Sequence, residues 1–287
     1  MLLNPFTYHR PKSLKEAVDL YRDLPNARLL AGGTMLINWL KTAKKSGFKT
    51  PQNIISLKGI PDLQGIQAEE GGASLLIKSM TTFSEIIAHP NTSHIPLLCA
   101  LKSICRLLGT TQIRNMGTIG GNLTSRYTWT ELGAVMISLN ATCHFINVRQ
   151  EGLSCSAEQF FLAGARASGI LTHVSLPLIP DSRICYFRKP RISEIDIPLM
   201  AVCAQARITG NTFRAPRITI NRGTLFPERY HELETFLDGK TAQQDTVTGI
   251  LPMIEPKKFD PQSDGYKQHL YRIAIRDSIQ GLLKETA

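Results

Sequence analysis

The chain has 287 residues, 43% of them apolar, and a formal net charge of +10. No apolar run approaches the ~18 residues of a membrane-spanning helix, and the first residues lack the pattern of a secretory signal, so we expect a soluble cytoplasmic protein of about two domains. The basic residues are scattered without interleaved aromatic residues, which argues against a nucleic-acid-binding protein. Their densest cluster, Lys41, Lys44, Lys45 and Lys49, is typical of a solvated helix end or of a face that docks an acidic partner subunit.

Helices and short strands alternate through the first hundred residues. Ser13-Leu14-Lys15-Glu16 is a capping box that predicts a helix over 13–23, and Thr82-Phe83-Ser84-Glu85 is a second one that opens a helix through residue 87. Apolar runs bounded by turn residues predict further strands. The expected strands are 28–31, 53–57 and 74–80, and the other expected helices are 36–40 and 96–109.

The second half of the chain contains fewer clear signals. A proline-containing turn at 176–181 marks a plausible domain boundary. On the last expected helix an apolar stripe is typical of core packing rather than of a cofactor site; its members are Tyr271, Ile275, Ile279 and Leu282. The remaining expected elements are an apolar segment at 133–139, strands at 141–148, 199–206 and 218–220, and helices at 232–237 and 265–284.

Two glycine pairs are the most informative feature of the sequence. They lie in Leu29-Leu30-Ala31-Gly32-Gly33-Thr34-Met35-Leu36 and in Gly117-Thr118-Ile119-Gly120-Gly121-Asn122. A Gly-Gly step permits positive φ and close approach of a ligand, and successive amides in such a turn form a nest for a phosphate. The first pair lies between a strand and a helix, whose N-terminal amides add to an anion site. Together the pairs predict one large anionic ligand gripped at two points, whereas Gly32-Gly33 alone is also compatible with an ordinary tight turn.

Catalytic motifs are missing from the sequence. It contains no G-x-G-x-x-G, no Walker lysine loop and no G-x-S-x-G. The six cysteines form no C-x-x-C pair and the seven histidines show no metal-ligand spacing, so we expect no metal or iron–sulfur site on this chain. The cysteines are expected mostly as buried thiols without disulfides. Such a chain suits a protein whose cofactor carries the reaction.

At these residues the sequence resembles the FAD-binding subunit of molybdenum hydroxylases, the xanthine dehydrogenase, aldehyde oxidoreductase and carbon monoxide dehydrogenase type enzymes. The resemblance runs almost end to end. Beside the two glycine motifs it rests on Phe6-Thr7-Tyr8-His9-Arg10-Pro11 with the helix start after it, on Gln112-Ile113-Arg114-Asn115, and on Phe187-Arg188-Lys189 with Asp196-Ile197. The resemblance implies an α+β chain with a two-subdomain FAD-binding fold of the PCMH, or vanillyl-alcohol-oxidase, type, followed by a smaller α+β C-terminal domain.

The implied boundaries are 1–178 for the FAD-binding domain, with subdomains of about 1–57 and 58–178, and 179–287 for the C-terminal domain. The resemblance implies that the first glycine turn holds the FAD pyrophosphate through its amides and the Thr34 hydroxyl. It implies that the second runs against the flavin and ribityl chain, with Ile119 on the ring system and Gly120 and Gly121 permitting backbone contact. The implied cofactor-binding residues are Leu29, Leu30, Ala31, Gly32, Gly33, Thr34, Met35, Leu36, Gly117, Thr118, Ile119, Gly120, Gly121, Asn122, Glu131, Ile170, Phe187 and Arg188.

Two positions depart from the family pattern. Met35 stands where the family usually has Asp, and Glu131 where an Asp is typical, after a segment that contains the bulky residues Arg126, Tyr127 and Trp129. Glu131 is expected either to reach a ribityl or adenosine hydroxyl or to be a solvated loop carboxylate. The bulky residues are expected to alter access to the flavin.

The resemblance implies an oxidoreductase subunit of a hetero-oligomer, with no catalytic acid or base on this chain. A large partner subunit would carry the molybdenum cofactor and hydroxylate the substrate, and a small one would carry the iron–sulfur clusters. Electrons would pass through FAD to NAD⁺ or another acceptor. The alternative hypotheses are a flavin-free assembly subunit of the same kind of complex and a basic nucleic-acid-binding protein.

Overall fold

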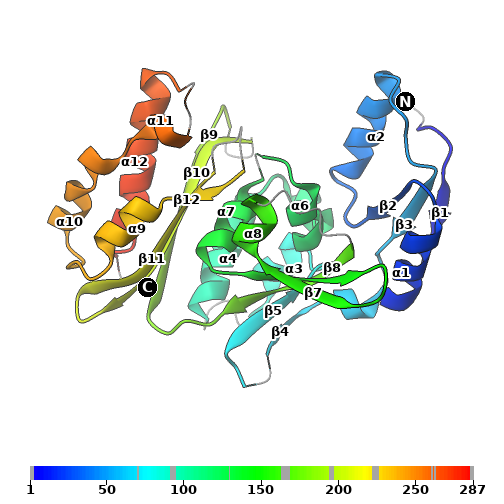
Figure 1. The fold of residues 1–287 in the computed structure, drawn as a ribbon, viewed down its shortest axis with the longest axis horizontal. Coiled ribbons are helices and arrows are strands. Elements are labelled where there is room, and N and C mark those ends of the chain that lie inside the picture. Colours follow the sequence, from blue (N-terminus) through cyan, green and yellow to red (C-terminus); the bar gives the residue numbers. More distant parts are fainter. Residues whose placement is uncertain are drawn as a thin grey trace.

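The computed structural model describes residues 3–69, 71–90, 95–128, 130–162, 169–193, 197–221, 226–259, 261 and 263–284. Their helices and strands form three units that follow one another along the chain, each built on its own sheet (Figure 1). Within the described ranges no helix is long and apolar enough to cross a membrane.

The N-terminal unit is a small parallel sheet with two crossover helices. Its strands β1 (Thr7–His9), β2 (Ala27–Leu30) and β3 (Asn53–Ser56) are arranged in the order β1-β3-β2, and parallel neighbours require such crossovers. The helices are α1 (Leu14–Asp23) and α2 (Leu36–Lys45). The Ser13 hydroxyl accepts a hydrogen bond from the Glu16 amide and caps α1 as predicted. This connectivity puts the first glycine turn between the end of β2 and the start of α2.

The middle unit is an antiparallel sheet with helices on one face (Figure 1). Its strand order is β4-β5-β8-β6-β7, and buried and partly exposed residues alternate along β5 and β6. The strands are β4 (Ile66–Ala68), β5 (Ser74–Lys78), β6 (Thr142–Asn147), β7 (Gly152–Ser156) and β8 (Gly169–Pro177). The helices are a 3₁₀ turn, η1 (Pro61–Leu63), and α3 (Phe83–Ala88), α4 (Pro96–Arg106), α5 (Thr111–Met116), α6 (Ile119–Ser125), α7 (Glu131–Ser138) and α8 (Ala157–Leu162).

The C-terminal unit is a four-stranded antiparallel sheet with helices on both faces. Its order is β12-β11-β10-β9, from β9 (Ser182–Pro190), β10 (Pro198–Thr209), β11 (Thr212–Asn221) and β12 (Glu228–Arg229). Helices α9 and α12 pack on one face, and α7 and α4 of the middle unit pack against the strands from the other side. The remaining bounds are α9 (His231–Leu237), α10 (Gln244–Gly249), η3 (Leu251–Met253), α11 (Pro256–Phe259) and α12 (Gly265–Gly281).

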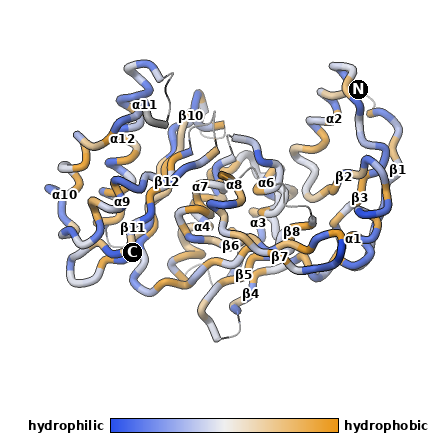
Figure 2. The backbone as a smooth tube through the Cα atoms, viewed as in Figure 1, coloured by the Kyte–Doolittle hydropathy of each residue, from blue (hydrophilic) through white to orange (hydrophobic). Residues whose placement is uncertain are grey.

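The hydrophobic core is divided into three clusters that follow these units. Figure 2 shows apolar segments concentrated where α4 meets the strands of the middle sheet. The Tyr271, Ile275, Ile279 and Leu282 stripe of α12 is buried in the C-terminal cluster, which confirms core packing. Burying such side chains contributes about 1.5–3 kcal/mol each. The middle and C-terminal units each have a large cluster, whereas the N-terminal unit shares its cluster with Leu63, Met80 and Ile170 of the middle unit. The sheets occupy 7–56, 66–177 and 182–229; they support the predicted domain boundaries at residues 57 and 178, which remain a prediction.

Several sequence-based expectations need correction. Two helices, α5 and α6, occupy the segment that leads through the second glycine motif, where a turn was expected. Strands β7, β8 and β9 and helix α8 had not been predicted. All six cysteines are free thiols, but only Cys105, Cys143 and Cys203 are buried; Cys155 and Cys185 are partly exposed and Cys99 is exposed.

Candidate functional site

The first glycine turn presents unused amides at the start of a helix. Gly33 has a φ of +82°, a left-handed conformation that glycine adopts at little cost. Among the described residues, no acceptor bonds the amides of residues 32–36. They stand at the N-terminus of the ten-residue helix α2, where the helix dipole favours an anion. The turn therefore has the donors expected of a diphosphate site.

The two glycine segments lie against each other. A Cβ built at Gly32 would come 1.8 Å from the carbonyl oxygen of Met116, and one built at Gly121 would come 3.2 Å from the Cβ of Ala31. No side chain fits in the first position, so Gly32 is required by the contact between the segments. In Figure 1 this contact lies where α6 faces the N-terminal unit. The prediction that both motifs belong to one place in the fold is supported.

The second glycine segment does not present an amide nest, which corrects the expectation of two gripping turns. Thr118 caps helix α6, and its side-chain oxygen accepts from the Gly121 amide at 3.0 Å. The amides of Ile119 and Gly120 donate to the carbonyl oxygens of Thr81 and Ser79 at 3.0 and 2.8 Å, and those of Gly117 and Asn122 also donate to backbone carbonyls. These amides are already hydrogen-bonded within the chain and are not available to a ligand. None of the glycines 117, 120 and 121 has positive φ.

Two residues of this segment face protein instead of a ligand. A Cβ on Gly120 would lie 2.6 Å from the Cβ of Ser79, so this glycine permits α6 to approach the end of β5. Ile119 is fully buried in the core of the middle unit, and it exposes no surface to a flavin ring. Because the Ile119 side chain points into the core, the structure gives no support to its expected contact with the ring system, which stays a prediction.

The signature before the second glycine segment fixes its position. The Arg114 guanidinium donates to the carbonyl oxygens of Gly109 at 2.5 Å and Arg106 at 3.1 Å, which closes the end of α4. The Asn115 side-chain oxygen accepts from Ser84 of α3 at 2.5 Å. Arg114 and Asn115, the two residues before Met116, thus help to hold Met116 and Gly117 where Gly32 contacts them.

Asn122 carries an unused acceptor beside this contact. Its Oδ1 is buried and has no hydrogen-bond partner among the described residues, and a buried acceptor left without a partner costs free energy. Thr34, on the facing turn, is only partly buried. A cofactor with hydroxyl donors would satisfy Asn122, so the residues at the contact fit a nucleotide-type ligand with a polyhydroxyl chain.

The other predicted binding residues are distributed over several environments. Leu29, Leu30, Ala31, Met35 and Leu36 are partly exposed around the first turn. Ile170 is buried in the cluster that joins the N-terminal unit to the middle sheet. Phe187 packs against the core of the C-terminal unit. The structure therefore brings the two glycine segments together but gives Ile170 and Phe187 packing roles.

Glu131 and Arg188 meet in a buried ion pair. The Arg188 Nε lies 2.7 Å from Glu131 Oε1, and both side chains are less than 10% exposed. The Tyr186 hydroxyl also donates to that carboxylate. Burial, together with the Glu131 charge, raises the pKa of Tyr186 well above its usual value, so it stays a neutral donor. The alternative of a solvated Glu131 is thus wrong, and the carboxylate instead links α7 to β9.

Of the bulky residues that precede Glu131, Arg126 has a clear packing role in the structure. The Arg126 guanidinium stacks over the rings of Phe160 and Phe226 at 5.2 and 4.8 Å and donates to the Phe161 carbonyl. Its side chain therefore packs against the middle unit. Trp129, expected to alter access to the flavin, lies outside the described residues.

Sequence reasoning missed the residues that complete these contacts. Tyr186 was not predicted, although alternation along a strand at 182–190 would have placed it on the same face as Arg188. Met116 and Ile37 are exposed apolar side chains next to the first turn. An exposed apolar residue at a helix end carries no sequence signal that distinguishes it from ordinary surface.

Comparisons with known proteins agree with this geometry. The family described as FAD binding domain in molybdopterin dehydrogenase matches residues 4–179. The chain is 34% identical to the carbon monoxide dehydrogenase medium chain of Afipia carboxidovorans, over 98% of this chain and 97% of that protein. It is 26% identical to the xanthine dehydrogenase FAD-binding subunit of Escherichia coli O157:H7, over 95% and 94% of the two chains.

The fold agrees as well. A solved structure of reconstituted CO dehydrogenase from Oligotropha carboxidovorans covers 99% of both chains with a TM-score of 0.86 at 26% identity. The chain belongs to the family of FAD-binding subunits of molybdopterin dehydrogenases. The predicted PCMH-type fold, the oxidoreductase class and FAD as the cofactor are thereby confirmed.

Proposed function

We propose that this member of the FAD-binding family holds FAD at the contact between its two glycine segments and carries electrons within a molybdenum hydroxylase complex. The observation that supports the site most directly is the turn at residues 32–36. Its amides are unused among the described residues and stand at the start of helix α2, and the backbone of Gly32 lies against Met116 and Gly117. A diphosphate at this place gains several main-chain donors without a lysine or arginine.

Each part of the chain would have a different task. The amides of Gly33, Thr34 and Met35 would bind the diphosphate, and the Asn122 Oδ1 would accept from a hydroxyl of the ribityl chain. The Glu131–Arg188 pair would fix the C-terminal unit against α7. The bound isoalloxazine supplies the redox chemistry, so no side chain of this chain needs to transfer a proton. Met35, where the family resemblance implies an Asp, has no side-chain oxygen to accept a hydrogen bond from the cofactor.

The proposed partners are inferred from relatives that are a medium chain and a FAD-binding subunit. We propose a large subunit with the molybdenum cofactor and a small one with iron–sulfur clusters, assembled in the cytoplasm. Electrons would pass from the clusters to FAD and then to an acceptor, with NAD⁺ as one candidate. This division of work suits a chain whose cysteines lack cluster spacing.

A titration of the full chain with FAD tests the proposed site. Gly32→Ala places a methyl group against the Met116 carbonyl and is expected to abolish saturable quenching of FAD fluorescence. Gly72→Ala is the matched control, because a Cβ at Gly72 meets nothing within 4 Å. Gly72 has positive φ and lies in the turn before β5, outside the glycine segments. This variant should bind FAD as wild type does. Equal affinity in wild type and Gly32→Ala would refute the proposed position of FAD.

The electron route is tested on the complex isolated with its partner subunits. Under anaerobic conditions, xanthine, an aldehyde, nicotinate and carbon monoxide are each added, and the flavin absorbance band is followed. At least one reductant should bleach the band, and NAD⁺ added afterwards should restore it if NAD⁺ is the acceptor. A band that no reductant bleaches, in a complex with intact clusters, would contradict the proposed route through this chain.

A further inference from the structure

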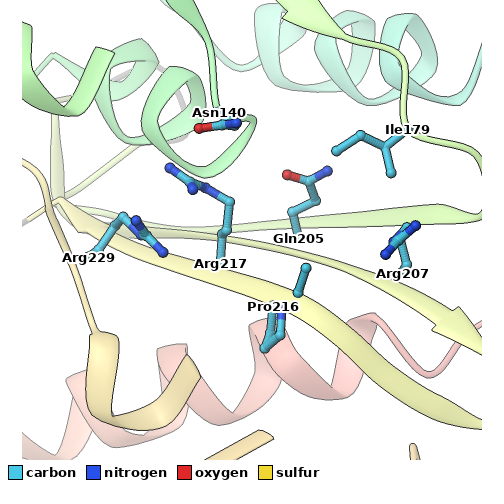
Figure 3. Close-up of a pocket in the computed structure, with 8 residues that line it drawn as sticks. Asn140, Ile179, Gln205, Arg207, Pro216, Arg217 and Arg229 are labelled. Carbon is cyan, nitrogen blue, oxygen red and sulfur yellow. The ribbon is translucent and has the colours of Figure 1, made fainter. Parts of the chain in front are cut away.

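A pocket lined by several charged and amide side chains lies at the junction of the middle and C-terminal units, apart from the glycine segments. It has a volume of about 230 Å³ and is lined by the sheet residues Gln205, Arg207, Arg217 and Arg229, by Asn140 after α7, and by Ile179 in the segment between β8 and β9. Figure 3 shows Arg217 and Gln205 rising from neighbouring strands toward Asn140 and Ile179. The glycine segments contribute no residue to its lining.

The register of the sheet explains why these side chains share one face. Gln205 of β10 is the direct partner of Arg217 of β11, and two residues along, Cys203 is the partner of Thr219. Side chains two apart on a strand point the same way. The Ser138 hydroxyl of α7 bonds the Thr219 hydroxyl at 2.8 Å, so this is the face that packs on α7. The pocket forms where that packing ends.

Gln205 is buried with an unused polar atom. Only 5% of the residue is exposed. Its Nε2 donates to the Ser182 hydroxyl at 2.8 Å, and its Oε1 has no partner within the described part of the chain. Because a serine hydroxyl can donate as well as accept, a 180° rotation of the amide keeps the bond to Ser182 and turns Nε2 toward the pocket. Gln205 can therefore offer an N–H to a ligand.

The charges around the pocket leave one guanidinium uncompensated. Arg229 pairs with Glu158 at 3.0 Å and with Glu234 at 2.6 Å. Glu158 also lies 3.8 Å from Arg217, and His231 lies within 3.5 Å of both carboxylates. Among the lining side chains and their ion-pair partners, three guanidinium groups stand against two carboxylates, an excess of one positive charge before His231 is counted. The exposed Asp238 carboxylate lies nearby but accepts from the Ala215 amide at 2.9 Å.

The guanidinium group without a carboxylate partner in the described part of the chain is that of Arg207. Arg217 donates through Nε and Nη2 to the Ile137 carbonyl at 3.2 and 3.0 Å, which neutralises the negative end of α7. Burial, followed by the neighbouring Arg229 charge, lowers the pKa of Arg217. Arg207 is exposed and makes no ion pair among the described residues. A guanidinium of this kind next to a buried amide is suited to bind an oxyanion through two N–H groups.

We propose that this pocket binds a small oxyanion, a phosphate or carboxylate group, between Arg207, Gln205 and Arg217. The anion would compensate the excess charge and use the Gln205 amide. It would also touch residues of both units, because Asn140 follows α7 and Arg207 belongs to β10. A ligand that binds only the folded chain stabilises it according to its concentration relative to its Kd, so the proposal predicts an anion-dependent rise in Tm.

The experiment uses the purified full chain with inorganic phosphate and, in a separate arm, acetate, each against chloride at equal ionic strength. Isothermal titration and thermal unfolding measure binding. Saturable binding is expected for wild type, with at least a tenfold loss of affinity in Arg207→Ala and in Gln205→Leu. The matched control is Arg214→Ala, because Arg214 is the cross-strand partner of Arg207 and also exposed but does not line the pocket; it should bind as wild type does.

The arms separate the possible results. Saturation by phosphate alone assigns a phosphate group, and saturation by acetate as well assigns a carboxylate-sized site. Phosphate and acetate that act no differently from chloride would overturn the proposal. An equal loss in Arg207→Ala and Arg214→Ala would also overturn it, since it would reflect overall charge. If Gln205→Leu folds and binds the anion with unchanged affinity, the Gln205 amide does not contact the anion. None of these readouts depends on FAD, so they distinguish this proposal from that of the glycine site.

Discussion

Gly33 and Gly47 share a left-handed backbone and differ in their surroundings. Their φ values are +82° and +72°, so alanine at either position costs roughly 1 kcal/mol in backbone strain. A Cβ at Gly33 would meet Leu30 and Ile37 at 3.2 Å, whereas one at Gly47 meets nothing within 4 Å. We predict that Gly33→Ala weakens FAD binding by at least about tenfold, which corresponds to about 1.4 kcal/mol.

Gly47→Ala serves as the matched control for strain alone. It should lower the urea midpoint by a similar amount and leave the dissociation constant for FAD unchanged. Both quantities are measured on the same preparations by chemical unfolding and by fluorescence titration. A loss of FAD affinity in Gly47→Ala as large as that in Gly33→Ala would show that general destabilisation, rather than the turn, controls binding.

His173 gives the protein a pH dependence of stability. It stacks on His144 with ring centroids 4.2 Å apart. Burial, followed by the charges of His144 and Lys78, lowers the pKa of His173 from 6.5 to about 4. Between these values the unfolded chain binds more protons than the folded one. The free energy of unfolding should therefore fall as the pH drops from about 6.5 to about 4.

Urea unfolding at a series of pH values checks the effect of His173. We expect His173→Gln to flatten the dependence in this window, while His269→Gln, a change of an exposed histidine, should keep it. If the slope between pH 4 and 6.5 were the same in wild type and His173→Gln, the stacked pair would not be its source.

At the level of single residues, the sequence indicated which segments matter better than it indicated why. The resemblance placed Gly32 and Gly120 at the site, and both positions exclude a Cβ. For Gly120 the excluded space belongs to Ser79 of the chain itself. A pattern of glycines cannot reveal whether the neighbour is a ligand or the backbone of another element, since both require the same missing side chain.

The link between α7 and β9 is the element-scale feature with the clearest energetic consequence. Removing one partner of a buried ion pair leaves an uncompensated charge and costs about 3–5 kcal/mol. We predict a loss of this size for Glu131→Gln, because Arg188 and Tyr186 then face a neutral amide. The double variant Glu131→Leu with Arg188→Met should recover much of the stability. Chemical unfolding measures both.

Two outcomes would argue against this role of Glu131. One is a Glu131→Gln chain as stable as wild type. The other is a double variant that loses the sum of the two single effects, which would show no coupling between the two side chains. Arg22 and Asp19 form an exposed pair that serves as the comparison, since exposed pairs contribute about 1 kcal/mol or less.

Elements with strong local signals were predicted and those that depend on tertiary context were not. The Thr82 capping box is complete in the structure, with the Glu85 carboxylate accepting from the Thr82 amide, because its hydrogen bonds lie within four residues. Helix α6 was missed, since two glycines near its start lower helix propensity, while the Thr118 cap and the packing of Gly120 on Ser79 support it. Strand β9 was missed because apolar residues lie on both of its faces, with Ile184 and Tyr186 packed on the middle core and Cys185 and Phe187 on the C-terminal core, so its sequence shows no alternation of apolar and polar residues.

At the scale of the whole molecule, the described residues link the three units at two junctions. The glycine segments and the apolar cluster around Ile170 connect the N-terminal and middle units, and the Glu131–Arg188 and Arg229–Glu158 ion pairs connect the middle and C-terminal units. FAD bound at the first junction adds contacts between units. We predict that saturating FAD raises the Tm of the full chain, by an amount that grows with FAD concentration, and that AMP, which lacks the diphosphate and flavin, raises it less.

The proposed FAD site combines the unused amides of residues 32–36 with the close approach of Gly32 to the second glycine segment. The most direct measurement is the flavin content of the purified full chain, determined from its absorbance spectrum after dialysis. We predict one FAD per chain in wild type and none in Gly32→Ala, with both proteins folded by circular dichroism. A folded wild-type chain that stays colourless after refolding with excess FAD, and still copurifies with its partner subunits, would contradict the account and support a flavin-free assembly subunit.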